Sequence, residues 1–237
     1  EGSVFESVDA FLQAKLGSND AEVAEAAQAA LARVSGQGEG EEEEEEVVEE
    51  SLLFPIDAQG HATVPEGETE LPENAFMSCR SLISITLPAS LTSIGNDAFS
   101  QCASLALTNL PEGLTSIGND AFNNCTSLAL TSLPAGLTSI GDRVFDGCDS
   151  LALTSLPDGL ASIGCSAFRC CYSLALTSLP NGLTSIGSWA FEACGSLALT
   201  RLPDGLTSID DCAFNGCASL TLTSLPDGLT SIGYCAF

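Results

Sequence analysis

The chain has 237 residues, 45% of them hydrophobic, and a formal net charge of −26 from 32 acidic and only 6 basic side chains. So few lysines and arginines cannot form the positive surface that nucleic acid or an anionic membrane requires. No apolar run approaches the roughly 20 residues of a membrane-spanning helix, so we predict no membrane insertion. A protein of basic character is the partner that this charge favours.

The first 36 residues predict two short helices. Ser3 and Glu6 fit a capping box at the start of the first helix, and apolar residues at helical spacing follow. Asn19 is placed to cap a second helix that ends before Gly36. We therefore expect residues 1–36 to form a helical hairpin or the tail of a preceding domain. Packing of the two apolar faces against each other is the simpler interpretation, and docking of a helix on a partner is the alternative.

Residues 37–50 differ in composition from both neighbours. They are rich in glutamate, including an unbroken run over 41–46. Such a run repels itself and has no apolar surface to bury, so it predicts an acidic low-complexity linker, with an acidic recognition tail as the alternative.

Residues 51–75 read as an N-terminal cap for the repeats that follow. They align with later repeats but carry Glu68 where those repeats have leucine. Terminal repeats are expected to be more polar because one face meets solvent. Within the cap, residues 57–60 predict a turn between two short strands.

Residues 76–237 repeat a 23-residue unit without insertion or deletion. A fixed period of this length predicts a solenoid, in which each residue stacks on its counterpart in the next turn and only neighbouring turns can close the core. The motif Leu-Thr-Ser-Ile begins at Leu91, Leu114, Leu137, Leu183, Leu206 and Leu229, with a near copy at Leu160; the aligned phenylalanines are Phe76, Phe99, Phe122, Phe145, Phe168, Phe191, Phe214 and Phe237; and the aligned cysteines are Cys79, Cys102, Cys125, Cys148, Cys171, Cys194 and Cys217.

One repeat divides into four predicted pieces. Residues 105–107 alternate as a half-buried strand does. Residues 110–113 hold Pro and Gly and predict a turn. Residues 114–117 are a second short extended stretch, and residues 121–125 are expected to close the loop as a single helical or 3₁₀ turn. The result is a stack of short parallel strands about 4.8 Å apart, with columns of Leu, Ile, Phe and Cys inside.

The pattern Leu-Pro-x-x-Leu-Thr-Ser-Ile-Gly-x-x-Ala-Phe-x-x-Cys-x-Ser-Leu resembles the BspA-like (Treponema-type) leucine-rich repeat, over roughly residues 63–237. The resemblance implies a leucine-rich-repeat solenoid of short parallel β-strands with 23-residue repeats, here preceded by a small N-terminal α-helical segment. It also implies protein recognition, since members are often surface proteins of bacteria and protists linked to adhesion. One departure concerns the first strand: later repeats place leucine one position earlier, as at Leu107, and threonine where the family has isoleucine. A one-residue slip of this kind reverses which side chains face inward.

The array, residues 76–237, stops in mid-repeat at Phe237. We therefore expect a fragment of a longer protein. An uncapped last strand presents unpaired backbone groups, so edge-to-edge self-association at this end is also expected.

Eleven cysteines are present. Seven form the repeated column, and we predict free buried thiols for them because cysteine is small and often buried, and because parallel stacking points neighbouring Cβ atoms the same way. Free thiols favour a reducing, cytoplasmic compartment, with the cell surface as the alternative implied by the family resemblance. The single histidine, His61, and the lack of paired Cys-x-x-Cys spacing give no metal site, and we predict no cofactor. No catalytic constellation can be assembled, so we predict no enzyme.

The few positions that change from repeat to repeat are the candidate binding site. Aromatic and arginine side chains on a surface are typical of binding hot spots. Drift at tolerant loop positions is the alternative. The partner-binding candidates are Arg143, Arg169, Tyr172, Trp189, Arg201 and Tyr234.

These observations favour a non-enzymatic protein-binding module that recognises a protein through its solenoid surface. A cell-surface adhesin of the BspA-like type and the targeting arm of a longer enzyme are the alternatives. A third reading is an ice-binding surface, because Thr115 and its equivalents form a regular column of hydroxyls.

Overall fold

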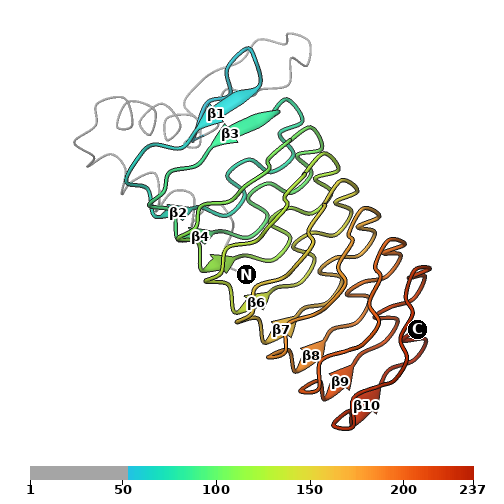
Figure 1. Cartoon of the computed structure of the whole chain (residues 1–237). Coiled ribbons are helices and arrows are strands. Elements are labelled where there is room, and N and C mark those ends of the chain that lie inside the picture. The colour runs from blue at the N-terminus through green and yellow to red at the C-terminus, as the bar shows by residue number, and fades with distance from the viewer. Residues whose placement is uncertain (1–52) are drawn as a thin grey trace, which may run out of the picture.

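The computed structural model describes residues 53–237. The predicted helices of residues 1–36, the linker 37–50 and the first two residues of the cap lie outside the described residues. The described part is a solenoid whose turns stack along one axis (Figure 1). This confirms the predicted fold class for the repeats. In the described range, no helix is long and apolar enough to cross a bilayer.

Short strands mark each turn, and every pair of named strands is parallel. Residues 23 apart face each other in each pair, so the sequence period is one turn of the coil. Three sheets result, with orders β1-β3, β2-β4-β5 and β10-β9-β8-β7-β6. The strands are β1 (His61–Thr63), β2 (Glu70–Leu71), β3 (Ser84–Thr86), β4 (Ser93–Ile94), β5 (Ser116–Ile117), β6 (Ser139–Ile140), β7 (Ser162–Ile163), β8 (Ser185–Ile186), β9 (Ser208–Ile209) and β10 (Ser231–Ile232).

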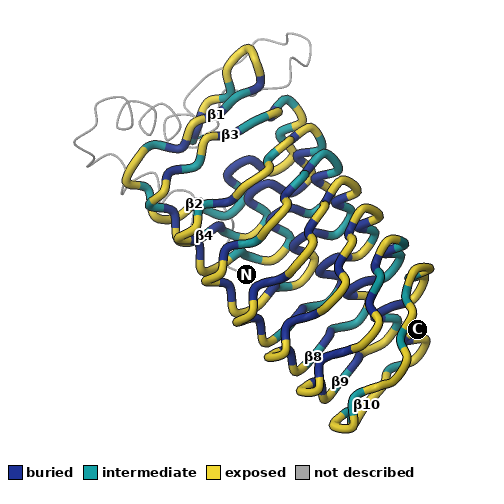
Figure 2. Tube along the Cα trace, in the orientation of Figure 1, coloured by how far each residue is buried: buried dark blue, intermediate teal, exposed yellow. Residues whose placement is uncertain are grey.

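A continuous stack of phenylalanine rings fills the core from the first described turn to the last. Ring centroids lie 5.1 Å apart for Phe99 and Phe122 and 5.9 Å apart for Phe54 and Phe76, the extremes of the series. Most neighbouring rings are within 15° of parallel, the offset-stacked arrangement that aromatic pairs favour. The buried segments of Figure 2 run through the middle of the turns. The stack is Phe54, Phe76, Phe99, Phe122, Phe145, Phe168, Phe191, Phe214 and Phe237.

The cysteine column has a role that the sequence analysis missed. Six of its seven thiols, from Cys102 to Cys217, donate a hydrogen bond to a phenylalanine carbonyl oxygen of the preceding turn, for example Cys125 Sγ to Phe99 O at 3.0 Å and Cys148 Sγ to Phe122 O at 3.1 Å. The same bond recurs six times, at 2.9 to 3.1 Å. These six thiols form no disulfide, as predicted. Burial raises the pKa of Cys125 to about 12, and burial raises the pKa of Cys148 well above its ordinary value.

The loop after each Ile is not the helical turn that the sequence predicted. In the 119–124 loop, Asp120 and Asn124 have φ of 56° and 57°, in the left-handed region, so the backbone cannot continue a helix. Their N–H groups instead donate to carbonyl oxygens of the next turn, at Asp142 (3.0 Å) and Asp146 (2.7 Å). Two left-handed positions per turn therefore build a second ladder of backbone hydrogen bonds. Its N–H groups donate to the next turn, whereas those beside the strands donate to the preceding turn, as Gly118 N does to Ile94 O.

Ala193 occupies one of these left-handed positions, with φ of 59°. The equivalent residues two turns before it and one turn after it are Gly147 and Gly216, with φ of 71° and 75°. A Cβ atom at such φ costs on the order of 1 kcal/mol. We expect Ala193→Gly to raise the free energy of unfolding by about 1 kcal/mol and Gly216→Ala, the matched reverse change, to lower it similarly. Urea unfolding of both variants checks the pair, and a loss of stability in Ala193→Gly would contradict the argument.

The first predicted strand of each repeat forms only once. Ile85 in β3 is buried and pairs with β1, but the equivalent Thr108 and Thr131 are exposed. In those repeats the preceding residue points inward instead, as Leu130 does. The one-residue shift is thus real, and it gives leucine the inward place that β3 gives to the β-branched Ile85, a residue type that favours pairing. Residues 105–107 keep the alternation but are not a strand; this prediction was wrong.

The strand ladder is also interrupted between β5 and β6, since no pairing joins Ser116–Ile117 to Ser139–Ile140 among the described residues. The loop side of the same two turns stays joined, because Phe122 N donates to Val144 O at 2.9 Å. The rings of Phe122 and Phe145 also remain stacked, with centroids 5.7 Å apart. The aromatic core and the loop ladder are therefore more continuous than the sheet.

The turn predicted within the cap is present. Asp57 N donates to His61 O at 2.8 Å, and Asp57 Oδ1 accepts from the N–H groups of Gln59 and His61. The His61 ring is held by Ser84 Oγ at 2.8 Å and Thr86 Oγ1 at 3.1 Å. These contacts give His61 a structural role at the junction of β1 and β3.

Candidate partner-binding edge

Four of the six candidate residues lie on one edge of the solenoid. We define the variable edge as residues 96–101, 119–124, 142–147, 165–170, 188–193, 211–216 and 234–237, the loops that follow the short strands. Arg143 and Trp189 occupy the same position two turns apart, Arg169 lies three residues after that position, and Tyr234 lies one residue before it. The sequence spacing of the variable positions therefore reflects one continuous surface.

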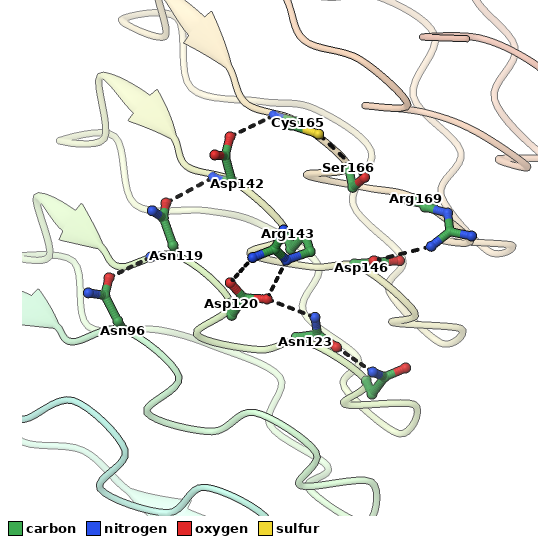
Figure 3. Close-up of polar contacts among 11 residues, drawn as sticks. Asn96, Asn119, Asp120, Asn123, Asp142, Arg143, Asp146, Cys165, Ser166 and Arg169 are labelled. Carbon is green, nitrogen blue, oxygen red and sulfur yellow. Dashed lines mark hydrogen bonds and ion pairs between the residues drawn. The ribbon is translucent and has the colours of Figure 1, made fainter. Parts of the chain in front are cut away.

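A column of amide and carboxylate side chains supports this edge (Figure 3). Asn96 Oδ1 accepts from Asn119 N at 2.8 Å, Asn119 Oδ1 accepts from Asp142 N at 2.9 Å, and Asp142 Oδ1 accepts from Cys165 N at 2.8 Å. Each side chain thus satisfies a backbone donor of the next turn. The column continues at Asp211, whose Oδ1 accepts from Tyr234 N at 2.6 Å.

The arginines of the edge are held by carboxylates of neighbouring turns. Arg143 forms two bonds to Asp120, from Nε to Oδ1 at 2.7 Å and from Nη2 to Oδ2 at 2.9 Å. Arg169 donates from Nε to Glu192 Oε2 at 2.9 Å. It also lies 3.7 Å from Asp146 (Figure 3). Paired guanidinium groups of this kind are fixed in direction, while about half of each arginine side chain, 51% and 47%, stays exposed.

Two carboxylates of the edge are affected by their partial burial. Burial raises the pKa of Asp146, and the nearby Arg169 opposes that rise. Burial and the neighbouring Asp120 raise the pKa of Asp97. Both groups are therefore protonated more readily in the folded chain than in the unfolded one, which means that their charge costs stability at neutral pH.

Arg143 and Trp189 are large residues at a position that is left-handed in every described turn. Their φ values are 50° and 56°, where aspartate and asparagine are tolerated but a bulky residue is a genuine outlier. Trp189 is 41% exposed and is the only tryptophan of the chain. The indole therefore stands on the surface at a position whose backbone disfavours it.

The other three candidates, Tyr172, Tyr234 and Arg201, occupy different parts of the repeat. Tyr172 is 53% exposed in the short turn that follows Cys171, next to the variable edge. Tyr234 is 80% exposed on the last described turn. Arg201 is exposed on the segment that leads to the Pro-containing turn, outside the variable edge. The structure thus brings together Arg143, Arg169 and Trp189 and separates them from Arg201.

The threonine column beside the strands is tied to the backbone. Thr115 Oγ1 donates to Thr92 O at 3.2 Å, and Thr207 Oγ1 donates to Thr184 O at 3.0 Å. Ala161 interrupts the column, so the hydroxyls are not a regular array over its whole length. These hydroxyls stabilise the stacking of turns, which weakens the ice-binding alternative. Within residues 53–237, no group of three or more His, Cys, Asp or Glu side chains is placed to hold a metal ion.

Comparison with known proteins agrees with this architecture. A family model described as BspA type leucine-rich repeat region matches residues 60–155 and 138–237, in six copies. The crystal structure of a Treponema pallidum leucine-rich repeat protein is 31% identical and superposes with a TM-score of 0.56; the match covers 76% of this chain and 82% of that one. No curated protein gives a significant match.

Two further structures are similar at lower levels. A leucine-rich repeat protein from Eubacterium ventriosum is 24% identical, with a TM-score of 0.56 over 73% of this chain and 46% of its own. A protein from Faecalibacterium prausnitzii, described as a leucine rich cell surface protein, is 28% identical over 73% of this chain and 59% of its own, with a TM-score of only 0.36. The first of these shows the shared fold, and the second adds no argument about this chain.

Proposed function

The chain belongs to the BspA-type leucine-rich-repeat family, and we propose that it is a non-enzymatic protein-binding module that docks its partner on the variable edge. A stack of repeats offers a long, regular and rigid surface, which suits recognition of another protein. The family's scaffold role supports this proposal, and the partner and its site are our inference.

The observation that carries the proposal is the exposed Trp189 in a left-handed backbone conformation. Its counterparts one turn before and one turn after are Ser166 and Cys212, both smaller. A strained backbone conformation persists where the surrounding structure enforces it, and such positions cluster at functional sites. Tryptophan and arginine are also the residues most enriched at the energetic centre of interfaces. Both features meet at Trp189, two turns from Arg143.

Charge on the variable edge supports a basic partner. The edge carries six carboxylates, at Asp97, Asp120, Asp142, Asp146, Glu192 and Asp211, against two arginines, which gives a net charge of −4. Since Arg143 and Arg169 are already paired within the edge, the unpaired charge that a partner meets is negative. A protein with positive side chains around an apolar anchor would complement this surface.

Binding is tested with three baits of the array in a lysate of the source cells. We expect a partner held by the native chain to be lost at least tenfold by Trp189→Asn, since a central tryptophan contributes about 2 kcal/mol or more. Asparagine suits left-handed φ, so the fold should be at least as stable in this variant. Arg201→Ser, which lies outside the edge, is the control and should retain the partner.

Two outcomes of this capture would contradict the proposal. One is equal retention by the native and Trp189→Asn baits, which would make Trp189 a product of drift. The other is loss with Arg201→Ser alone, which would move the site away from the variable edge.

The adhesin and the targeting arm of a longer enzyme are special cases of the same proposal, because both use the array to hold a protein. The buried thiols do not separate these cases. Five of them, from Cys102 to Cys194, are buried hydrogen-bond donors, and this burial protects them from oxidants in either kind of compartment. Protease treatment of intact source cells, followed by detection of the chain, distinguishes a surface protein from an internal one.

A further inference from the structure

Four cysteines lie outside the buried column, and two of them occupy the same position in successive turns. Cys212 is half-buried and Cys235 is exposed. The other two have no such neighbour: Cys165 stands between Asp142 and Ser188, and Cys170 between Gly147 and Ala193. The register of the solenoid therefore places Cys212 and Cys235 side by side on the variable edge.

The backbone around this pair is held in register. Cys212 N donates to Tyr234 O at 2.8 Å, and Tyr234 N donates to Asp211 Oδ1 at 2.6 Å. The φ values of Cys212 and Cys235 are 55° and 49°, so their Cβ atoms point the same way, and a bond requires the exposed Cys235 side chain to turn toward Cys212. Stacked parallel turns lie about 4.8 Å apart, within the roughly 4.4–6.8 Å that separates the Cα atoms of disulfide-linked residues.

These two residues differ from the buried column in exposure and in hydrogen bonding. Column thiols are enclosed and engaged with phenylalanine carbonyls, whereas Cys235 is exposed and free to turn toward its neighbour. Partial burial and the adjacent Cys235 raise the pKa of the Cys212 thiol, and a hydrogen bond from Trp189 lowers it. Trp189 occupies the same position one turn before Cys212, so the indole lies next to the pair in the same column.

We propose that Cys212 and Cys235 are a redox-active pair that forms an intramolecular disulfide by exchange with a small-molecule disulfide such as oxidised glutathione. The thiolate of the exposed Cys235 attacks the glutathione disulfide, which forms a mixed disulfide and releases one glutathione thiolate. The Cys212 thiolate then attacks the Cys235 sulfur and releases the second glutathione. Two electrons pass to the oxidant, and the two protons of the protein thiols pass to the two glutathione thiolates.

Such a bond would fix two turns of the array to each other at the edge that carries Trp189. It closes a loop of one repeat, so it restricts the unfolded chain as well as the native edge. Its formation would therefore couple the redox state to the rigidity of the surface beside the tryptophan.

Trp189 provides a direct readout, because a disulfide close to an indole quenches its fluorescence. The full chain is incubated with oxidised glutathione, alkylated and digested after Asp227, a cleavage that separates Cys212 from Cys235. We expect one intramolecular bond joining the two fragments, a mass lower by two hydrogens, and a fall in tryptophan fluorescence that dithiothreitol reverses. Cys235→Ser should abolish all three changes, and Cys165→Ser should leave them intact.

Several results would contradict the proposed disulfide between Cys212 and Cys235. A glutathione adduct that persists on Cys235 of the native chain would show that Cys212 cannot reach it. Covalent dimers in place of the internal bond would show that the thiols react between chains. Quenching that survives in Cys235→Ser would assign the fluorescence change to another cysteine. Far-ultraviolet circular dichroism of each variant, compared with the native chain, establishes that the serine variants remain folded.

Discussion

Raising the pH above about 9 is expected to unfold the array steeply, because the cysteine column must stay protonated to remain buried. Burial raises the pKa of Cys102, Cys125, Cys148, Cys171 and Cys194, to about 12 for Cys125. Unfolded thiols titrate at about 8.5. Below that pH both states hold their protons, and above it only the unfolded chain releases them. Stability therefore falls as pH rises through this window, by about 1.4 kcal/mol per pH unit for each thiol.

Five such thiols give a combined slope of about 7 kcal/mol per pH unit, against a typical domain stability of about 5–15 kcal/mol. The array should therefore unfold within roughly two pH units of the thiol titration. Urea unfolding in the presence of a phosphine reductant, repeated from pH 7 to pH 11, measures the slope. Cys148→Ser keeps a hydrogen-bond donor but does not titrate here, so its slope should be smaller by about one-fifth. A native chain whose stability is flat up to pH 10 would contradict the argument.

Removing one ring from the aromatic stack is expected to be the most damaging single substitution. Phe145 is fully buried between Phe122 and Phe168, with centroids 5.7 Å and 5.5 Å away. Phe145→Ala loses the transfer free energy of the ring and both stacking contacts. It also leaves a cavity, so the surrounding side chains lose packing contacts. We expect the free energy of unfolding to fall by about 3–5 kcal/mol.

Two comparison variants sharpen this measurement. Phe145→Leu keeps most of the volume and should lose less than half as much, which separates packing from the special contribution of the ring. Met77→Ala removes a side chain that is 44% exposed and should change stability by less than about 0.5 kcal/mol. Equal losses in the free energy of unfolding for Phe145→Ala and Met77→Ala would show that the stack contributes no more to stability than an exposed side chain.

The repeat period predicted the architecture because it acts on every turn alike. Phe99 and Phe122 must stack if the coil advances one turn per 23 residues, and the strand register of Ser93 on Ser116 follows from the same spacing. Such regularity needs no knowledge of side-chain detail. Position in the repeat also predicted that Cys125 is buried and free.

Hydrogen-bond geometry, by contrast, could not be derived from spacing. The sequence suggested cysteine as a small apolar filler, whereas Cys125 Sγ satisfies Phe99 O. An aliphatic residue would also have fitted a narrow core, and the repeated choice of cysteine is the signal that could have indicated a donor. The left-handed positions were missed for a similar reason. Aspartate and asparagine are frequent at positive φ, as at Asp120 and Asn124, but the equivalent positions also hold Arg143 and Trp189, so the residue types show no consistent preference.

The placement of the candidate residues followed from the sequence only in part. Variation along the repeats pointed to Arg143, Arg169 and Trp189, which the fold gathers on one edge. The partners Asp120 and Glu192 were not anticipated, because ion pairs between turns depend on the tilt of side chains at neighbouring positions. Arg201 was grouped with the others on residue type alone, and its place in the repeat sets it apart.

The gap between β5 and β6 has a consequence for how the molecule opens. In a chain of turns that touch only their neighbours, cooperativity is transmitted through each interface in series, and the weakest interface divides the chain into separate folding units. Amide hydrogens of β4 and β5 would then exchange with solvent on a different timescale from those of β7 and β8. One polypeptide with a single aromatic core would then open first on its strand side between residues 117 and 139, where the ring stack and the loop ladder still join the two blocks.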